Sequence, residues 1–396
     1  MLFQSITLIA FLGVMPSQSP PNIKDGDMVA LVGGTLIERE QVSGYWETEL
    51  TRRLTGQKVR FRNLGWSGDT VYGHARAGFG STADGYKRLI EHINVVKPTV
   101  TLFAYGANES FEGETGASAF QKGYEKLLKD LSGTKSKSIL LSPLWHENMG
   151  PPLPDAAPHN LNLQAYGKMI DDIAKANQAN FYDLFQSKTS CEAMLGKSMK
   201  LTSNGIHPTE LGYYLLSNDI SRAFGLDEEL WQVAIDTAGG AISSKGCNVE
   251  AAGKMTWKVT DKMLPRPVVS GFASLNPSPR TIAIKNLPKG TYKLLVDGKD
   301  VMVKDSEDWG RGVVISSGPD FDQVEMMRKM ILEKNRQYFH RWRPQNETYL
   351  LGFRKHEQGQ NARELPQFDP IVAAKEEEIF KLNKSITRTY SLMESK

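Results

Sequence analysis

Four short segments of this sequence carry the groups that acyl-transfer chemistry needs. In chain order they are residues 33–35 (Gly-Gly-Thr), 63–69 (Asn-Leu-Gly-Trp-Ser-Gly-Asp), 106–109 (Gly-Ala-Asn-Glu) and 204–208 (Asn-Gly-Ile-His-Pro). Together they contain a hydroxyl, an imidazole, an amide and glycines whose backbone N–H groups can face a ligand. A hydroxyl activated by an imidazole can attack an acyl carbon, and N–H donors stabilise the negative charge that develops on the carbonyl oxygen. The four segments therefore predict an acyl-transfer site, provided that the fold brings them together.

The surrounding sequence predicts a fold that does so. Short apolar runs, rich in β-branched or aromatic residues, predict strands at 28–32, 59–61, 100–105, 139–141 and 181–184. Helical spacing of apolar residues lies between them, at 43–54, 127–131 and 166–173, and a last helix is expected at 210–224. Alternating strands and helices form a parallel, doubly wound sheet. Ligands bind beyond the carboxyl ends of such strands, where the first three segments are expected to lie.

The four segments resemble, in the same order, the four sequence blocks of the SGNH (GDSL-type) hydrolase superfamily, over roughly residues 27–225. The resemblance implies a three-layer, flavodoxin-like α/β domain and an enzyme that hydrolyses carboxylic esters, with acylated carbohydrates among the substrates that the family uses. It implies that Thr35 is the nucleophile, that His207 is the base and that Asn204 orients His207. The oxyanion hole would combine the backbone N–H groups of Thr35 and Gly65 with the side chain of Asn108.

Three positions depart from the family's pattern. Thr35 stands where the family has serine, Gly34 where it has aspartate, and Asn204 where the triad aspartate belongs. The methyl group of a threonine crowds its hydroxyl and restricts its rotation. An asparagine can accept a hydrogen bond from an imidazole, but it offers no charge to the imidazolium that forms. In a different serine hydrolase the equivalent Asp-to-Asn change lowers kcat about 10⁴-fold, which corresponds to about 5.4 kcal/mol of barrier.

These departures leave three accounts of the site open. In the first, Thr35 is an active nucleophile and a carboxylate from elsewhere replaces the missing aspartate. The nearest candidates in sequence are Glu38, Glu40 and Glu109. In the second account, His207 or His146 activates water and Thr35 only binds the substrate. In the third, the protein is a catalytically inactive binding or interaction module that keeps the cleft.

Several of these residues also have a purely structural interpretation. Thr35 could cap the helix that follows, with Glu38 three residues later as in a capping box. The glycines could serve only tight turns, Asn108 could bond to its own turn, and His207 could be an ordinary loop residue. Three acids are interpreted as structural acceptors rather than catalysts: Asp69, Glu109 and Asp183.

Further residues are expected to shape the rim of the pocket. The candidates are Gly34, Trp66, Glu109 and His146. The segment 145–148 follows the fourth predicted strand and precedes three prolines at 151, 152 and 154. It is expected to be either a wall over the site or a proline-rich surface loop.

The second half of the sequence predicts a different architecture. Residues 228–241 are expected to be helical, and 255–317 to form a small antiparallel β unit with a turn at 297–298. Helices are expected at 321–342 and 373–382. Residues 341–349 combine arginines, aromatics and amides, which suits a carbohydrate-binding surface, an interdomain seam or a dimer contact. The predicted units are a signal peptide (1–19), an SGNH-like domain (24–225), a helix with a small β unit (226–320) and a helical C-terminal region (321–396).

The composition and the N-terminal segment indicate which partners the protein is expected to have and where it is expected to be located. The net charge of +3 gives no reason to expect a nucleic-acid partner, and the seven histidines show no metal-ligand spacing, so we expect neither a metal nor another cofactor. The two cysteines, Cys191 and Cys247, could form one bridge in an exported protein. The apolar run 6–15 is too short to span a membrane and predicts a signal peptide, hence a periplasmic or extracellular location. The expected partner is a small ester or an acylated carbohydrate, with oligomerisation possible through the C-terminal region.

Overall fold

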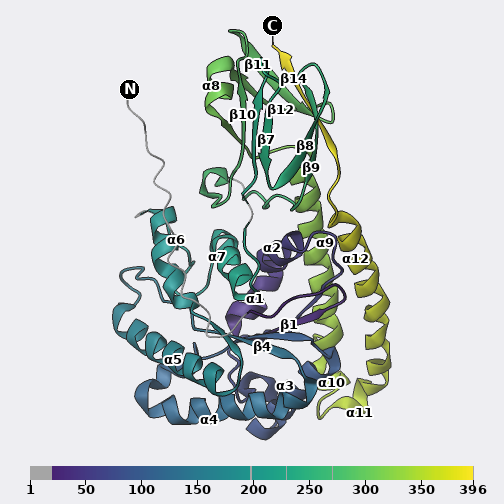
Figure 1. Cartoon of the computed structure of the whole chain (residues 1–396). Coiled ribbons are helices and arrows are strands. Elements are labelled where there is room, and N and C mark those ends of the chain that lie inside the picture. The colour runs from purple at the N-terminus through teal and green to yellow at the C-terminus, as the bar shows by residue number, and fades with distance from the viewer. Residues whose placement is uncertain (1–19, 197–198, 229, 270, 396) are drawn as a thin grey trace.

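The chain folds into two parts that lie one above the other (Figure 1). The computed structural model describes residues 20–196, 199–228, 230–269 and 271–395, so the predicted signal segment 1–19 lies outside the described residues. The lower part in Figure 1 contains one parallel sheet with helices, and the upper part contains two smaller sheets. Two long helices, α9 (Pro319–Trp342) and α12 (Phe368–Leu382), run along the side of the lower part.

The lower part is built on a five-stranded parallel sheet with the order β2-β1-β3-β4-β5. Its strands are β1 (Met28–Gly33), β2 (Arg60–Asn63), β3 (Val100–Ala104), β4 (Lys137–Leu141) and β5 (Asn180–Tyr182). Each strand overlaps one of the five predicted strands. This sheet, covered by helices on both faces, confirms the predicted flavodoxin-like α/β fold.

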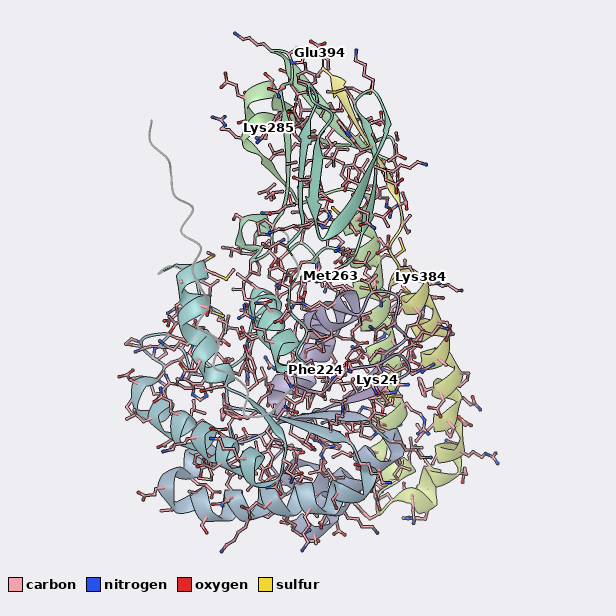
Figure 2. The ribbon with its side chains drawn as sticks, in the orientation of Figure 1. Lys24, Phe224, Met263, Lys285, Lys384 and Glu394 are labelled. Atoms are coloured by element: carbon pink, nitrogen blue, oxygen red, sulfur yellow. The ribbon has the colours of Figure 1, made fainter. Side chains whose placement is uncertain are left out.

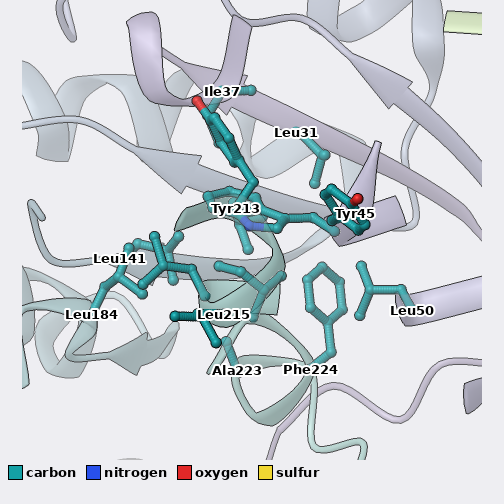
Figure 3. Packing of buried hydrophobic residues seen from close by; sticks show 14 of the residues in the cluster. Leu31, Ile37, Tyr45, Leu50, Leu141, Leu184, Tyr213, Leu215, Ala223 and Phe224 are labelled. Atoms are coloured by element: carbon teal, nitrogen blue, oxygen red, sulfur yellow. The ribbon is translucent and has the colours of Figure 1, made fainter. Parts of the chain in front are cut away.

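Helices cover both faces because successive residues of a strand point to opposite sides of the sheet. In β1, Leu31 belongs to one apolar core, whereas Ala30 and Val32 belong to the other. Figure 3 shows part of the first core, including Leu31, Tyr213 and Phe224. The helices on this side are α1 (Thr35–Ser43), α2 (Tyr45–Arg53), α6 (Ser187–Leu195) and α7 (Glu210–Ala223). Those on the other side are α3 (Thr82–Val96), α4 (Gly113–Leu131) and α5 (Ala157–Ala176).

Gly44 has a left-handed backbone conformation and lies within the stretch 43–54 that was predicted to be one helix. Gly44 has φ +67°, a conformation that residues with a side chain rarely adopt, and it ends α1 and begins α2. A Cβ atom at this position would lie 2.8 Å from Leu332 Cδ2 of α9. The turn therefore also allows the C-terminal helix to approach the lower part closely.

The helix predicted at 228–241 is wrong, because this stretch of the upper part contains a strand. This stretch contains strand β6 (Gln232–Asp236), in which Val233 and Ile235 are buried and alternate with more exposed residues. The alternation has the two-residue period of a strand, and it decides the structure because these two side chains pack into the core of the upper part. β6 lies outside the predicted β unit 255–317 and pairs in parallel with β10 (Arg280–Lys285) of that unit. Within the unit, β10 pairs with the strand Val313–Ile315 in the antiparallel sense that was expected.

The strands of the upper part form a four-stranded sheet, β13-β10-β6-β7, and a five-stranded sheet, β12-β11-β14-β9-β8. Their bounds are β7 (Ile242–Lys245), β8 (Cys247–Gly253), β9 (Thr256–Asp261), β10 (Arg280–Lys285), β11 (Thr291–Val296), β12 (Lys299–Asp305), β13 (Val313–Ile315) and β14 (Arg388–Glu394). β14 lies between β11 and β9, so the last residues of the chain complete this sheet. The C-terminal region is therefore not wholly helical, in contrast to our expectation.

Short helices connect these elements. They are η1 (His74–Ala77), η2 (Glu109–Glu112), η3 (Ser132–Thr134), η4 (Leu184–Gln186), η5 (Ala273–Leu275), α8 (Ser306–Arg311), α10 (Glu347–Leu350), α11 (Lys355–Gln358) and η6 (Gly359–Gln367). Cys191 lies in α6 and Cys247 begins β8, and no disulfide joins them. Among the described residues, no helix has both the length and the apolar character that crossing a membrane requires.

Candidate active site

A small cavity lies at the carboxyl ends of β1, β3 and β4, where the sequence predicted the site. Its volume is about 80 Å³. Its lining includes Thr35, Asn108, Glu109, His146 and His207, which come from four separate loops. The structure thus brings the hydroxyl, the amide and the imidazole of three distant segments to one small space, and the second segment contributes Asp69 to its wall.

Thr35 is the first residue of α1, and its hydroxyl is not used as a helix cap. The N-cap is Gly34, so the alternative interpretation, in which Thr35 caps the helix with Glu38 in a capping box, is wrong. Glu38 instead accepts the Ser67 N–H and pairs with Arg343. Thr35 Oγ1 accepts a hydrogen bond from the Gly68 N–H at 3.2 Å. A hydroxyl at a helix N-terminus, facing a backbone donor, is favourably placed to carry negative charge.

The predicted oxyanion donors differ in their surroundings. Asn108 Nδ2 donates to the Asp69 carbonyl at 2.8 Å, which holds the amide beside Gly34. The Gly65 N–H is already engaged, because it donates to Asn63 Oδ1 at 2.9 Å. The absence of a side chain at Gly65 serves packing, since a Cβ atom there would lie 2.2 Å from the Glu38 nitrogen.

Gly68 is the backbone donor that the sequence interpretation missed. It follows Gly65 by three residues in the same segment, has φ +76° and presents its N–H to Thr35 Oγ1. The signal available in the sequence was that this segment contains two glycines. Only the tertiary structure shows which of the two amides faces the hydroxyl.

His207 lies on a tight hairpin rather than on a regular element. Thr202 and Pro208 form an isolated bridge, and the Ser203 N–H donates to the His207 carbonyl at 2.9 Å. The imidazole is half-buried, and burial, aided by the charge of Arg39, lowers the pKa of His207 below its usual value. A histidine in this state is neutral at pH 7 and can accept a proton.

Asn204 shapes the backbone of this hairpin. Its Oδ1 accepts the N–H groups of Ile206 at 3.2 Å and of His207 at 2.9 Å. The expectation that Asn204 orients the imidazole is therefore not what the structure shows. Within the described residues, no hydrogen bond connects the His207 ring to Thr35, to Asn204 or to a carboxylate.

Glu147 connects this hairpin to the loop after β4. Its carboxylate accepts the backbone N–H groups of Leu201 at 3.0 Å and Thr202 at 2.7 Å, and also the Thr202 hydroxyl. The Glu147 N–H in turn donates to the Gly205 carbonyl at 2.8 Å. These bonds fix the hairpin relative to the loop after β4, and they thereby fix the position of His207 at the cavity.

Among the three candidate carboxylates, only Glu109 lines the cavity. It accepts the N–H groups of Val71 and Gly106, both at 2.9 Å, and burial raises the pKa of Glu109 to about 7 despite these donors. Glu40 is fully buried and accepts the Trp46 N–H at 2.9 Å, away from the cavity. Burial, with the nearby Glu47 charge, raises the pKa of Glu40 to about 7 as well.

The other acids have structural partners. Asp69 is buried in an ion pair with Arg76 at 2.6 Å. Asp183 caps the turn that follows β5 by accepting the Phe185 N–H at 3.2 Å. Glu109 and Asp183 thus accept backbone N–H groups as predicted, whereas the carboxylate of Asp69 binds a guanidinium.

A stack of aromatic rings extends from the cavity to the surface. His146, which lines the cavity, stacks on His159 with ring centres 4.7 Å apart, and His159 stacks on Phe111 at 4.0 Å. Phe111 is 64% exposed. Burial and the neighbouring histidines lower the pKa of His146 to about 4, so this ring is uncharged at pH 7. The stack offers a flat, neutral surface beside the cavity.

Trp66 does not belong to this rim, in contrast to our expectation. Among the described residues, those that line the cavity do not include Trp66, which is buried beneath Arg343 with the guanidinium 3.8 Å from its ring centre. Glu347 pairs with Arg88 of α3 at 2.6 Å. The arginine-rich segment 341–349 thus packs against the lower part. Of the roles expected for this segment, the structure shows that of a contact between two regions of the chain.

Comparison with known proteins assigns the lower part to a family. The model of the GDSL-like Lipase/Acylhydrolase family matches residues 32–215. Residues 32–215 form a GDSL-like acylhydrolase domain. This confirms the family resemblance that the four segments carried, and it supports an ester-hydrolysing enzyme.

Among curated proteins, no sequence matches this chain. Within the described residues, no group of three or more His, Cys, Asp or Glu side chains could hold a metal ion.

A solved structure shares the fold of nearly the whole chain, the lower and the upper part together. BT4096, described as a gut microbial diltiazem-metabolizing enzyme, is similar over 94% of this chain and 99% of its own, with a TM-score of 0.72 and 15% identity. This likeness concerns the fold alone. A mutant of Axe2, an acetylxylan esterase from Geobacillus stearothermophilus, covers 52% of this chain and 97% of its own, with a TM-score of 0.41 and 16% identity.

Proposed function

We propose that this protein hydrolyses esters of short acyl groups, with Thr35 as nucleophile and His207 as general base. The observation that carries the proposal is the shared cavity, which holds the Thr35 hydroxyl, the Asn108 amide and the His207 imidazole beside the Gly68 N–H. The family match supports ester hydrolysis as the reaction class.

The reaction would proceed in two stages. Thr35 Oγ1 attacks the acyl carbon while its proton passes to His207, and the ester C–O bond breaks as the alcohol takes that proton. Water then attacks the acyl-threonine, giving its proton to His207, and the carboxylic acid leaves as Thr35 regains its hydrogen. The Gly68 N–H, the Thr35 N–H and Asn108 Nδ2 would stabilise the oxyanion in both stages.

The size of the cavity favours a short acyl chain. A volume of about 80 Å³ is well below the several hundred Å³ of sites that enclose larger ligands. An acetyl group fits this space, whereas a long acyl chain would have to remain outside.

The alcohol would lie on the surface side of the cavity. The stacked rings of His146, His159 and Phe111 provide a flat, uncharged face there, which can pack against the apolar face of a sugar ring. We therefore propose an acylated carbohydrate as the natural substrate class. We also propose export from the cytoplasm, on the basis of the apolar run at 6–15.

The decisive experiment compares hydrolysis of acetyl and octanoyl esters by wild type and variants. We expect Thr35→Ala and His207→Ala to reduce kcat/KM for the acetyl ester at least about 100-fold. Thr35→Ser should retain or increase activity, and a serine acyl-enzyme should be detectable by mass spectrometry. The matched controls are Thr134→Ala and His356→Ala, which change residues that do not line the cavity. Unchanged rates in both site variants would contradict the proposal.

One observation favours a second candidate, a binding module without turnover. Among the described residues, the imidazole of His207 contacts neither the Thr35 hydroxyl nor a carboxylate through a hydrogen bond. This candidate predicts that calorimetry detects binding of an acetylated sugar, that wild type does not hydrolyse it, and that Thr35→Ala binds it equally well. Measurable turnover that depends on Thr35 would exclude it.

A further inference from the structure

An exposed arginine lies on the helix that carries the proposed nucleophile. Arg39 follows Thr35 by four residues and Leu36 by three in α1, and both of these residues line the cavity. Residues at these spacings share one face of a helix, and a helical side chain leans towards the N-terminus, here towards Thr35. Helix α1 packs beside α7, whose C-cap residue Phe224 is labelled in Figure 2, and Arg39 remains exposed. The Arg39 side chain therefore lies beside the mouth of the cavity.

The Arg39 guanidinium has no partner in the part of the chain that the structure describes. Its side chain forms neither a hydrogen bond nor an ion pair there. Glu38 of the same helix pairs with Arg343 at 3.0 Å. Glu40 is buried and accepts the Trp46 N–H at 2.9 Å. Because a guanidinium stays charged, Arg39 presents a full positive charge to a ligand at the cavity.

Other ionisable groups near the hairpin have partners or are uncharged. Glu210 of α7 accepts the Tyr45 hydroxyl at 2.9 Å and lies 3.9 Å from Arg328. Glu147 accepts two backbone N–H groups of the hairpin. His146 is uncharged at pH 7, because burial and the neighbouring histidines lower its pKa to about 4. These groups therefore do not compensate the charge of Arg39.

The charge of Arg39 acts on the proposed base. Burial first, and then the charge of Arg39, lower the pKa of His207, and no carboxylate is among the main causes. Within the described residues, no carboxylate forms a hydrogen bond with the His207 ring either. When Thr35 loses its proton, an imidazolium would form near a guanidinium, and like charges disfavour each other. A negative charge on the substrate at this place would offset both.

We infer that Arg39 binds a carboxylate on the alcohol part of the substrate, so that the ester derives from a hydroxy acid and, among carbohydrates, from a uronic acid. This role of Arg39 rests on the proposed function. The carboxylate belongs to the alcohol, because the cavity of about 80 Å³ holds only a short acyl group and its described lining does not include Arg39. One carboxylate offsets the single charge of a guanidinium and fits its planar geometry, whereas a phosphate monoester carries nearly two charges.

Two matched esters test this preference. The triacetates of methyl glucuronide and methyl glucoside differ in a carboxylate against a hydroxymethyl group, and their three acetyl groups lie at different distances from it. We expect wild type to release acetate from the glucuronide with a kcat/KM about 10- to 100-fold higher than from the glucoside, at pH 7.5 and low ionic strength. Equal values, or a preference for the glucoside, would overturn the inference.

Substitution of Arg39 shows whether it is the source of the preference. In Arg39→Gln, which removes the charge, the ratio of the two kcat/KM values should fall to about 1, whereas Arg39→Lys should keep part of it. The matched control is Arg336→Gln, which changes an exposed arginine of α9 and should keep the wild-type ratio. If Arg39→Gln slowed both esters equally and kept the ratio, Arg39 would act on the reaction in general and would not bind a carboxylate.

Titration of His207 by nuclear magnetic resonance reports binding without turnover. A carboxylate bound to Arg39 offsets its charge, so saturating methyl glucuronide should raise the pKa of His207 in wild type, and methyl glucoside at equal concentration should not. In Arg39→Gln this pKa should be higher without ligand, and glucuronide should no longer change it.

The titration also separates this inference from the proposed function. If no ester is hydrolysed but glucuronide raises the pKa of His207, the proposed function fails and the carboxylate site at Arg39 stands. If esters are hydrolysed but glucuronide leaves the pKa of His207 unchanged, the carboxylate site alone is excluded.

Discussion

Thr35 and His207 share one cavity, yet no carboxylate among the described residues stands behind the imidazole. A neutral imidazole can take the proton of the hydroxyl, but the imidazolium that forms then lacks a compensating charge. The Gly68 N–H, which donates to Thr35 Oγ1 in the free protein, would as a proposed oxyanion donor offset part of this deficit. We therefore expect a slow esterase whose rate depends on the oxyanion donors as much as on the base.

The pH dependence of the proposed reaction should identify the base. His207 must be neutral to accept a proton, so kcat/KM falls as the pH drops through its pKa. Since burial and the Arg39 charge lower that pKa, the midpoint of the acidic limb should lie below the usual value for histidine. Arg39→Met removes the charge, so the midpoint should move to higher pH, as measured by kcat/KM from pH 4 to 8.

The matched control for this measurement is Arg336→Met, which changes an exposed arginine of α9 and should leave the midpoint in place. Glu109 also titrates in the cavity, since burial raises its pKa to about 7. Arg39 is not among the main causes of that shift, so a midpoint insensitive to Arg39→Met would point to Glu109 rather than to His207.

At the scale of elements, the site depends on loops that are held to one another rather than on the strands alone. The strands place Thr35 and Asn108 at one edge of the sheet, but His207 reaches this edge on the 202–208 hairpin. Glu147, in the loop after β4, holds that hairpin through two backbone N–H groups and one hydroxyl. Glu147 is therefore a positioning residue for the proposed reaction.

Glu147→Gln should lower kcat about 10- to 100-fold with little change in KM. The amide replaces one acceptor oxygen by an NH₂ donor, which would face the backbone N–H groups that the carboxylate binds and would thereby displace the hairpin that carries His207. The measurement is steady-state kinetics with the acetyl ester, well below the Tm of each variant. Glu147→Asp, which keeps the charge, should recover part of kcat. The matched control, Glu192→Gln, alters an exposed acid of α6. An unchanged kcat in Glu147→Gln would remove Glu147 from this role.

At the scale of the whole molecule, the C-terminal helices are part of the structure that supports the site. α9 packs along α1 and α2, and α12 packs along α9 (Figure 1). Lys334 of α9 is buried, donates to the Glu47 carboxylate of α2 at 2.7 and 2.9 Å, and also donates to the Phe61 carbonyl of β2. One lysine thus connects α9 with a helix and a strand of the acylhydrolase domain.

Lys334→Met should lower the free energy of unfolding by about 3–5 kcal/mol, because it leaves the Glu47 carboxylate buried without its cation. Urea unfolding followed by circular dichroism measures the change. The double variant Lys334→Met/Glu47→Gln should recover much of the loss, since no buried charge remains. Lys329→Met, at an exposed position of the same helix, is the matched control and should have a small effect. If the double variant is as unstable as the single one, the ion pair is not the cause.

The acylhydrolase fold, and most of the residues that meet in its cavity, could be predicted from the sequence alone. The spacing of apolar residues predicts strands and helices, because it is a local property of the sequence. Ligands bind at the carboxyl ends of parallel strands, so segments that directly follow predicted strands are expected to lie at the site. That is why the sequence alone predicts that Thr35, Asn108, Glu109, His146 and His207 lie together, as they do in the cavity.

Hydrogen-bond partners from distant segments of the chain could not be predicted and are known only from the folded structure. It shows that the N–H of Gly68 rather than that of Gly65 faces the hydroxyl, and that Asn204 bonds backbone instead of the imidazole. It also shows a strand at 232–236, where a helix was expected, and places Arg388–Glu394 in the upper sheet, because these segments pair with strands far along the chain. A hydrogen bond is directional and reaches only about 3 Å, so its partner cannot be inferred from spacing along the chain.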